Sequence, residues 1–156
     1  MVKPKTTVKK ATARRAPRSP APATIDAPRP STTTDRAWIY AASPTRRLAE
    51  WEDGSAGKWC VFRHNDAIDQ AWLTVRSAIE AGRLPLAKVS TRLTSPRYGN
   101  THVICIYNQD WRDDAAITSA REVLHHLGFT EELGYKRDIE TSRGVYGTAE
   151  EWYRRA

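Results

Sequence analysis

Two amphipathic segments constrain the fold of this chain more than any other feature. Between residues 68 and 79, and again between 117 and 127, apolar residues recur every three or four positions, which places them on one face of a helix. We expect Asp66 to cap the first helix, and Asp113 or Asp114 to cap the second. A glycine suited to the position after the last turn follows each stripe, at Gly82 and Gly128.

Short apolar or β-branched runs surround these two helices, and each predicts a strand. They cover residues 38–40, 58–63, 88–92, 101–107 and 133–137. Near the end of the chain, Thr148 opens a capping-box sequence, which predicts a short helix over residues 148–155. The order of the elements neither alternates strictly nor segregates strands from helices. We therefore expect an α+β domain with a mostly antiparallel sheet and the two main helices packed on one face.

The composition changes sharply after residue 35. Residues 1–35 hold six of the nine prolines, eight of the 25 Lys+Arg and two of the 18 Asp+Glu, and they contain no aromatic residue. Such a segment buries too little apolar surface to offset its chain entropy, so we expect a disordered basic arm. Residues 36–156 hold 17 Lys+Arg, 16 Asp+Glu and all the aromatic residues, and we expect them to form a single domain.

Three interpretations of the arm remain open. An arm of this composition binds DNA or RNA phosphates by counterion release. It also suits a solubilising tail or an organellar transit peptide, although its prolines argue against the amphipathic helix that a transit peptide needs. No apolar segment suited to a secretory signal or a membrane span occurs, so we expect a soluble, cytoplasmic protein with no membrane partner.

The motifs of several common enzyme classes are absent. The sequence contains no P-loop, GxGxxG, GxSxG, HExxH or EF-hand pattern. The two cysteines, Cys60 and Cys105, lie in apolar strands and are interpreted as buried core thiols rather than reactive ones. We expect no cofactor and no metal.

The cations of the predicted strands are the candidate ligand-binding residues. Lys88, Ser90 and Arg92 alternate along one strand, so their side chains project from one face and offer two charges and a hydroxyl to a phosphate. Tyr135 and Lys136 lie in a second basic cluster. A solvated outer face of the sheet remains the alternative for all of these residues.

Two further residues are candidates because of their surroundings. Trp51 lies in a polar segment beside Glu52, where an indole stacks on a base and the carboxylate accepts hydrogen bonds from the base edge. His102 lies in a predicted strand among apolar neighbours, where a structural role and a functional one both fit.

Several segments share the pattern of a known family. They are Gly57-Lys58-Trp59, the helix 68–82 with Trp72, and the segments 88–91, 102–107 and 134–138 with Thr141 and 144–146. In this order they resemble the basophilic-leukaemia-expressed protein family, whose function is unknown and whose members are sometimes labelled phosphothreonine lyase domains. The resemblance runs over most of residues 37–146. The basic arm lies outside it.

That family is similar in fold to the eukaryotic cap-binding translation initiation factor, which has a curved antiparallel sheet backed by helices. In that factor, a Trp-Glu pair stacks on and hydrogen-bonds the methylated guanine. By position, the resemblance gives these roles to Trp51 and Glu52 and a phosphate contact to Arg92.

The lyase label implies another chemistry, in which a lysine removes the Cα proton of phosphothreonine and a histidine protonates the leaving phosphate. Lys88 or Lys136 is the candidate base, and His102 is the candidate acid. Three functions therefore remain open. The first is a non-catalytic binding domain for a nucleotide, RNA or another phosphorylated ligand, with the arm tethering it to nucleic acid. The others are a phosphothreonine lyase and a protein-interaction module.

Overall fold

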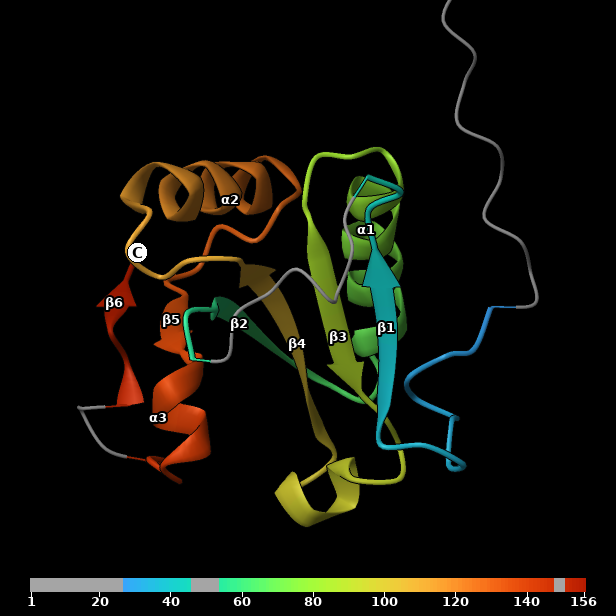
Figure 1. The fold of residues 1–156 in the computed structure, drawn as a ribbon. Helices are drawn as coiled ribbons and strands as arrows, with labels where there is room; N and C mark the ends of the chain where they lie inside the picture. The colour runs from blue at the N-terminus through green and yellow to red at the C-terminus, as the bar shows by residue number, and fades with distance from the viewer. Residues whose placement is uncertain (1–26, 46–53, 148–150) are drawn as a thin grey trace, which may run out of the picture.

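An antiparallel sheet with its two main helices on one face forms the body of the protein (Figure 1). The computed structural model describes residues 27–45, 54–147 and 151–156. Within these residues the sheet has six strands in the order β1-β3-β4-β2-β5-β6, and all their pairings are antiparallel. The strands are β1 Trp38–Ala42, β2 Gly57–His64, β3 Leu86–Ser90, β4 Thr101–Asn108, β5 Gly134–Arg137 and β6 Arg154–Arg155. The helices are α1 Ile68–Glu80, α2 Asp114–His126, the short α3 Asp138–Ser142 and the 3-10 helix η2 Ser95–Tyr98.

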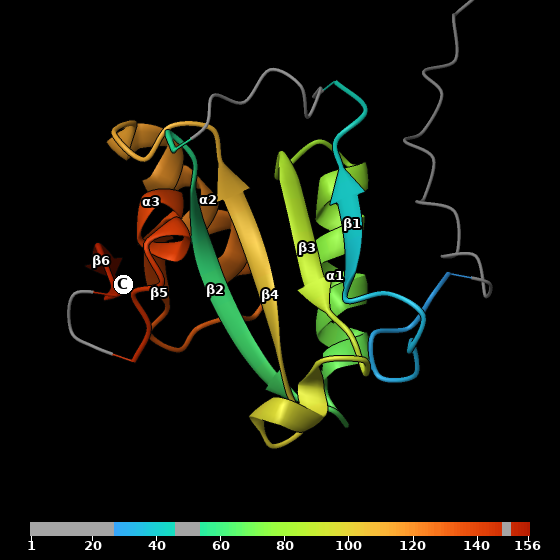
Figure 2. The same ribbon diagram turned by 60° about the horizontal axis from the view of Figure 1, so that its bottom comes forward.

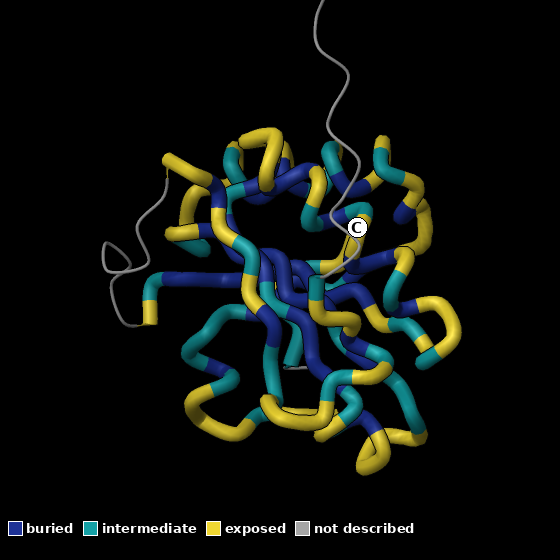
Figure 3. Tube along the Cα trace, turned by 90° about the vertical axis from the view of Figure 1, so that its right-hand side faces the viewer, coloured by how far each residue is buried: buried dark blue, intermediate teal, exposed yellow. Residues whose placement is uncertain are grey.

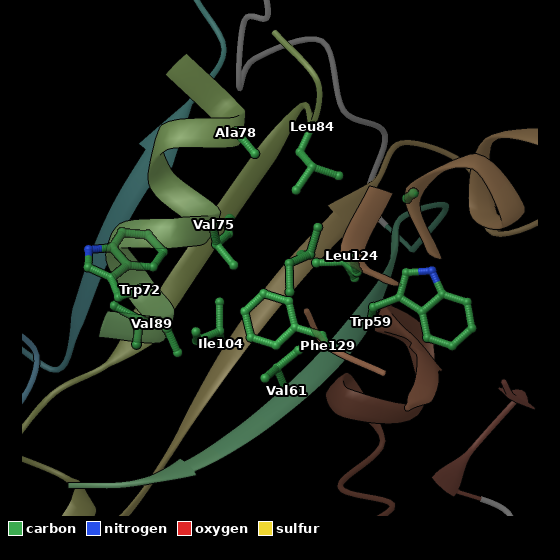
Figure 4. Packing of buried hydrophobic residues seen from close by; sticks show 14 of the residues in the cluster. Trp59, Val61, Trp72, Val75, Ala78, Leu84, Val89, Ile104, Leu124 and Phe129 are labelled. Atoms are coloured by element: carbon green, nitrogen blue, oxygen red, sulfur yellow. The ribbon is translucent and has the colours of Figure 1, made fainter. Parts of the chain in front are cut away.

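The two main helices lie behind the sheet and enclose the core with it (Figure 2). Trp72 and Val75 of α1 and Leu124 of α2 meet strand residues such as Trp59 and Ile104 in one cluster (Figure 4). The Trp59 indole donates a hydrogen bond to the Ile117 carbonyl oxygen at 3.0 Å, which ties β2 to α2. The predicted fold class is therefore confirmed.

The predicted cap of α2 is confirmed, and that of α1 is wrong. The Asp113 carboxylate accepts a hydrogen bond from the Ala116 backbone N–H at 3.0 Å. At α1 the N-cap is Ala67, which makes no side-chain capping bond. Asp66 lies one residue too early, and its carboxylate is instead 3.2 Å from the ring nitrogen Nδ1 of His64.

The strands occur where the sequence predicts them, with two differences at the ends of elements. The strand expected over residues 88–92 ends at Ser90. The helix expected over 148–155 is wrong at residues 154–155, which form β6 and pair with Gly134 and Tyr135. Residues 148–150 of that prediction lie outside the described residues.

The packed chain begins before residue 36. Pro30 is buried, and its carbonyl oxygen accepts a hydrogen bond from the Arg92 N–H at 2.9 Å. The Ser31 hydroxyl donates to the Asp69 carboxylate at 2.6 Å, and the Ser31 N–H donates to the same carboxylate at 3.0 Å. Pro30 and Ser31, which belong to the expected arm, are therefore bonded to α1 and to the chain after β3. Residues 1–26 lie outside the described residues.

Burial follows the layers of the fold (Figure 3). The central strands are mostly buried, and exposure increases in the connections and at the outer turns. Among the described residues, no helix is long and apolar enough to cross a membrane.

Candidate functional site

Three lysines lie on the face of the sheet opposite α1 and α2. Alternate residues of a strand point to opposite faces, so the strand register decides which side chains are neighbours. Lys58 pairs with Lys136 on β5 and with Tyr107 on β4, while Lys88 pairs with Cys105. We call the face that carries Lys58, Lys88 and Lys136 the lysine face.

Lys88 differs from the other two lysines because no described residue neutralises its charge. Its ammonium lies 4.2 Å from the centre of the Trp38 ring and 5.7 Å from that of Tyr107. Among the described residues, it forms no ion pair or hydrogen bond. Tyr40 lies directly opposite on β1 and is 57% exposed. Lys88 therefore presents a positive charge between aromatic rings at the β1 side of the lysine face.

Lys58 is held by the short helix α3. The residue is only 5% exposed, and its ammonium donates to the Asp138 carboxylate and to the Thr141 hydroxyl, the latter at 2.9 Å. The same ammonium lies 5.3 Å from the Tyr107 ring centre. Tyr107 is thus near both ammonium groups, and burial raises the pKa of its phenol so that it stays neutral.

Lys136 is enclosed by the end of the chain. Its ammonium donates to the Val145 carbonyl oxygen at 2.7 Å, lies 3.2 Å from the Glu151 carboxylate, and lies 3.7 Å from the Tyr146 ring centre. Three strand spacings of about 4.8 Å separate it from Lys88. The two lysines share a face, but they are too far apart to hold one phosphate group.

The predicted row of Lys88, Ser90 and Arg92 is interrupted. Ser90 shares the lysine face, and its hydroxyl oxygen accepts a hydrogen bond from the Val103 N–H at 2.9 Å. Arg92 follows the end of β3, and its guanidinium donates to the Asn100 side-chain oxygen at 2.9 Å. Arg92 therefore does not continue the row.

Two of the candidate residues, His102 and Tyr135, do not lie on the lysine face. His102 is fully buried, with Nδ1 2.8 Å from the Ser90 carbonyl oxygen and Nε2 3.0 Å from the Asn65 amide oxygen. Along β4 it alternates with the residues of the lysine face, so it points to the helix side. Tyr135 is also fully buried on the helix side, with its ring centre 5.1 Å from that of Trp59. In both strands the apolar residues at alternate positions indicate this orientation.

Trp51 and Glu52, the expected stacking pair, lie outside the described residues. Other residues of the site were not identified as functional from the sequence, namely Trp38, Tyr40, Lys58, Tyr107, Asp138 and Thr141. Lys58 alternates with Cys60 and Phe62, and this spacing already separates it from the core residues Trp59 and Val61. In the part of the chain that is described, no three His, Cys, Asp or Glu side chains gather in a way that could hold a metal ion.

An antiparallel sheet backed by helices on one face is the fold of cap-binding translation initiation factors. The structure of C. elegans eIF4E-3, solved in complex with the 4E-binding protein Mextli and a cap analogue, is similar to this chain with a TM-score of 0.52 and 18% sequence identity. The alignment covers 68% of this chain and 65% of that one, so this chain spans just under two thirds of its neighbour's length. At this identity the likeness shows the fold.

The chain belongs to the family of the basophilic leukemia-expressed protein Bles03, whose sequence model matches residues 43–142. The family and the fold expected from the sequence are therefore both confirmed. The matched range includes every strand of the lysine face except β1 and β6.

Proposed function

We propose that the protein is a non-catalytic binding domain for a phosphorylated ligand, such as a nucleotide or an RNA end, and that the β1 side of the lysine face receives it. The observation that carries this proposal is the ammonium of Lys88, which lies between the rings of Trp38 and Tyr107 and has no carboxylate partner within residues 27–45, 54–147 and 151–156. An ammonium in this position donates charge-assisted hydrogen bonds to a phosphate. The exposed ring of Tyr40 provides an adjacent stacking surface for a base.

The other two lysines of the lysine face are less suited than Lys88 to bind a phosphate. Lys58 and Lys136 each have a carboxylate partner, so their charges are already compensated. A phosphate at Lys88 finds a net positive charge, whereas a phosphate at Lys58 or Lys136 competes with Asp138 or Glu151. The ligand is therefore expected at the β1 side of the face.

The structural neighbour gives independent support. It was solved with a cap analogue, which contains a base and phosphates. The stacking role that the sequence predicts for Trp51 and Glu52 belongs to the same proposal, with these residues contacting the base and Lys88 contacting phosphate.

The lyase alternative receives no support from the arrangement of its candidate residues. A lyase needs its base and its acid at one substrate. Lys88 and Lys136 lie on the lysine face, but His102 is buried on the other side of the sheet. A protein-interaction module remains compatible with the fold, since the neighbour was also solved with a binding protein.

The test is a titration of the full chain with guanosine triphosphate, a cap analogue, adenosine triphosphate and a short RNA, followed by tryptophan fluorescence and calorimetry. We expect Lys88→Met to weaken binding of the tightest of these probes by roughly tenfold or more, because a hydrogen bond to a charged group contributes about 1.5–3 kcal/mol. Arg83→Met is the matched control, because it removes one charge from an exposed residue of the α1–β3 connection.

Two results would contradict the proposal. One is that none of the probes binds at millimolar concentration. The other is that Lys88→Met and Arg83→Met weaken binding equally, which would indicate a general charge effect. The Trp51→Ala variant tests the stacking role separately, and unchanged affinity in this variant would remove Trp51 from the site without affecting the role of Lys88.

A further inference from the structure

We propose that Cys60 and Cys105 are an oxidation site, at which the two thiols close to a disulfide that joins β2 and β4 across the middle of the lysine face. This inference is independent of the proposed ligand binding, because it rests on the strand register and the side-chain contacts of the two cysteines.

The register places the two cysteines directly opposite one another. Cys60 of β2 pairs with Cys105 of β4, and both residues are free thiols. Lys58, two residues before Cys60, and Lys88, the partner of Cys105 on β3, lie on the same face. Both sulfur atoms therefore project from the same side of the sheet.

The hydrogen-bond pattern of β2 shows which kind of pair they form. The Asp138 N–H donates to the Ala56 carbonyl oxygen at 2.9 Å, so the backbone groups of Ala56 and of every second residue after it turn towards β5. Cys60 is one of these residues, and its backbone groups consequently face away from β4. Cys60 and Cys105 are thus a non-hydrogen-bonded pair, the type with the closer approach, in which the two Cα atoms are about 4.5 Å apart. That spacing lies within the roughly 4.4–6.8 Å range of disulfides.

The two thiols already interact. The neighbouring Cys105 side chain, together with burial, raises the pKa of the Cys60 thiol, whereas the Cys60 side chain lowers the pKa of Cys105. The nearby ammonium groups of Lys58 and Lys88 lower the pKa of Cys105 further. Cys105 is accordingly the sulfur expected to react first.

Hydrogen peroxide is the oxidant in this scheme. The Cys105 thiol loses its proton, and the thiolate attacks one peroxide oxygen. The O–O bond breaks, the departing hydroxide takes up that proton to become water, and Cys105 is left as a sulfenic acid. The Cys60 sulfur then attacks the Cys105 sulfur and forms the S–S bond, while the hydroxyl group leaves with the Cys60 proton as water. In sum, two thiols and one hydrogen peroxide give one disulfide and two water molecules, with two electrons passing from sulfur to oxygen.

Burial selects among oxidants. Cys60 is 6% exposed and Cys105 is 4% exposed. A small oxidant can therefore reach the sulfur atoms in the folded protein, whereas a large one reacts only after local opening of the sheet. Hydrogen peroxide is close to water in size, whereas glutathione disulfide is a large peptide. We expect the reaction with glutathione disulfide to be at least tenfold slower.

The experiment treats the full folded chain with hydrogen peroxide, removes the oxidant with catalase, and unfolds the protein in an excess of a maleimide. Peptide mapping by mass spectrometry is expected to show peptides of Cys60 and Cys105 joined with the loss of two hydrogen atoms, and neither cysteine alkylated. Dithiothreitol added before the maleimide is expected to restore alkylation of both. Full alkylation without the reductant, addition of oxygen atoms to either sulfur that the reductant does not reverse, or disulfide-linked dimers would each overturn the proposal.

Two serine variants test the order of attack. In Cys60→Ser the sulfenic acid of Cys105 has no partner, so the trapping reagent dimedone is expected to label it. In Cys105→Ser the remaining Cys60 is expected to stay a thiol over the same exposure. Equal labelling of the two variants would contradict the assignment of Cys105 as the first sulfur to react.

Discussion

Lys58 is a charged residue kept inside the protein by its partners. Its carboxylate partner Asp138 lies on α3, and the hydroxyl of Thr141 provides a second acceptor. Burying an ammonium is costly unless it is paired and hydrogen-bonded, so α3 compensates a charge that β2 alone could not bury. Lys88 lies on the same face without such compensation among the described residues, and this difference separates a structural lysine from a candidate binding lysine.

The first prediction concerns this ion pair. Asp138→Ala leaves the Lys58 ammonium buried without its carboxylate and is expected to lower the free energy of unfolding by about 3 kcal/mol. The double variant Lys58→Met/Asp138→Ala is expected to recover most of that loss, because the buried charge is removed together with its partner. Urea denaturation followed by circular dichroism measures both values.

A surface pair supplies the control for that comparison. Arg112 and Asp110 lie 2.8 Å apart, with side chains 63% and 38% exposed. Asp110→Asn is expected to change the free energy of unfolding little, because an exposed ion pair contributes little to stability. If Asp138→Ala costs no more than this control, the ion pair of Lys58 does not stabilise the fold.

At the scale of elements, the end of the chain covers the β5 side of the lysine face. The Trp152 ring packs against Gly134 so closely that a Cβ atom at this glycine would overlap it. Phe62 meets the same indole in an edge-to-face arrangement, with ring centres 6.4 Å apart. The β5 side is therefore closed by residues that follow α3, and the β1 side keeps Tyr40 exposed.

The close approach of Trp152 to β5 gives a second prediction. Gly134→Ala is expected to lower the free energy of unfolding by about 1–3 kcal/mol, because the added methyl group displaces the indole. In a Trp152→Ala background the same change is expected to cost much less. A thermal denaturation cycle of the four proteins measures the coupling, and additive losses would show that the two residues do not meet.

Local periodicity explains which elements were predictable from the sequence. Residues close together in the sequence form the apolar stripes of α1 and α2 and the apolar runs of β1 to β5. The positions of these elements therefore follow from the spacing of apolar residues along the chain. The period of two in β3 likewise places Lys88 and Ser90 on one face. The helix predicted at residues 154–155 is wrong because these residues form β6 by pairing with β5. A capping pattern depends on neighbouring residues alone and does not reveal such a pairing.

The site was less predictable, because it depends on register between strands that are distant in sequence. Lys58 and its partner Asp138 are 80 residues apart, and only the pairing of β2 with β5 brings them together. His102 was grouped with Lys88 because the lyase label needs an acid as well as a base. Alternation along β4 places His102 and Cys105 on opposite faces, and the pairing of Lys88 with Cys105 then shows that Lys88 lies on the face opposite to His102.

On the scale of the whole molecule, most of the net charge lies in residues 1–26 of the basic arm. Residues 1–26 hold seven Lys+Arg and one Asp out of a chain with a formal net charge of +7. The charge of the chain therefore describes the arm more than the sheet. We propose that this arm tethers the domain to nucleic-acid phosphates, and that the lysine face recognises the phosphorylated ligand.

The third prediction follows from this division. Deleting residues 1–26 is expected to flatten the salt dependence of RNA binding, since the slope falls by roughly 0.7 for each phosphate contact on a single strand that is lost. Fluorescence anisotropy at several salt concentrations measures the slope. The deletion keeps Pro30 and Ser31, whose contacts belong to the fold. An unchanged slope would show that the arm does not contact the RNA.

The most direct test of the central claim is to map the binding of guanosine triphosphate and of pyrophosphate by NMR, following the backbone amides of the full chain. We predict that the largest chemical-shift changes fall on β1 and β3 around Trp38, Tyr40 and Lys88, and that they disappear in Lys88→Met. Changes that fall on α1 and α2, or the absence of changes with both compounds at millimolar concentration, would contradict the claim that the lysine face binds a phosphorylated ligand.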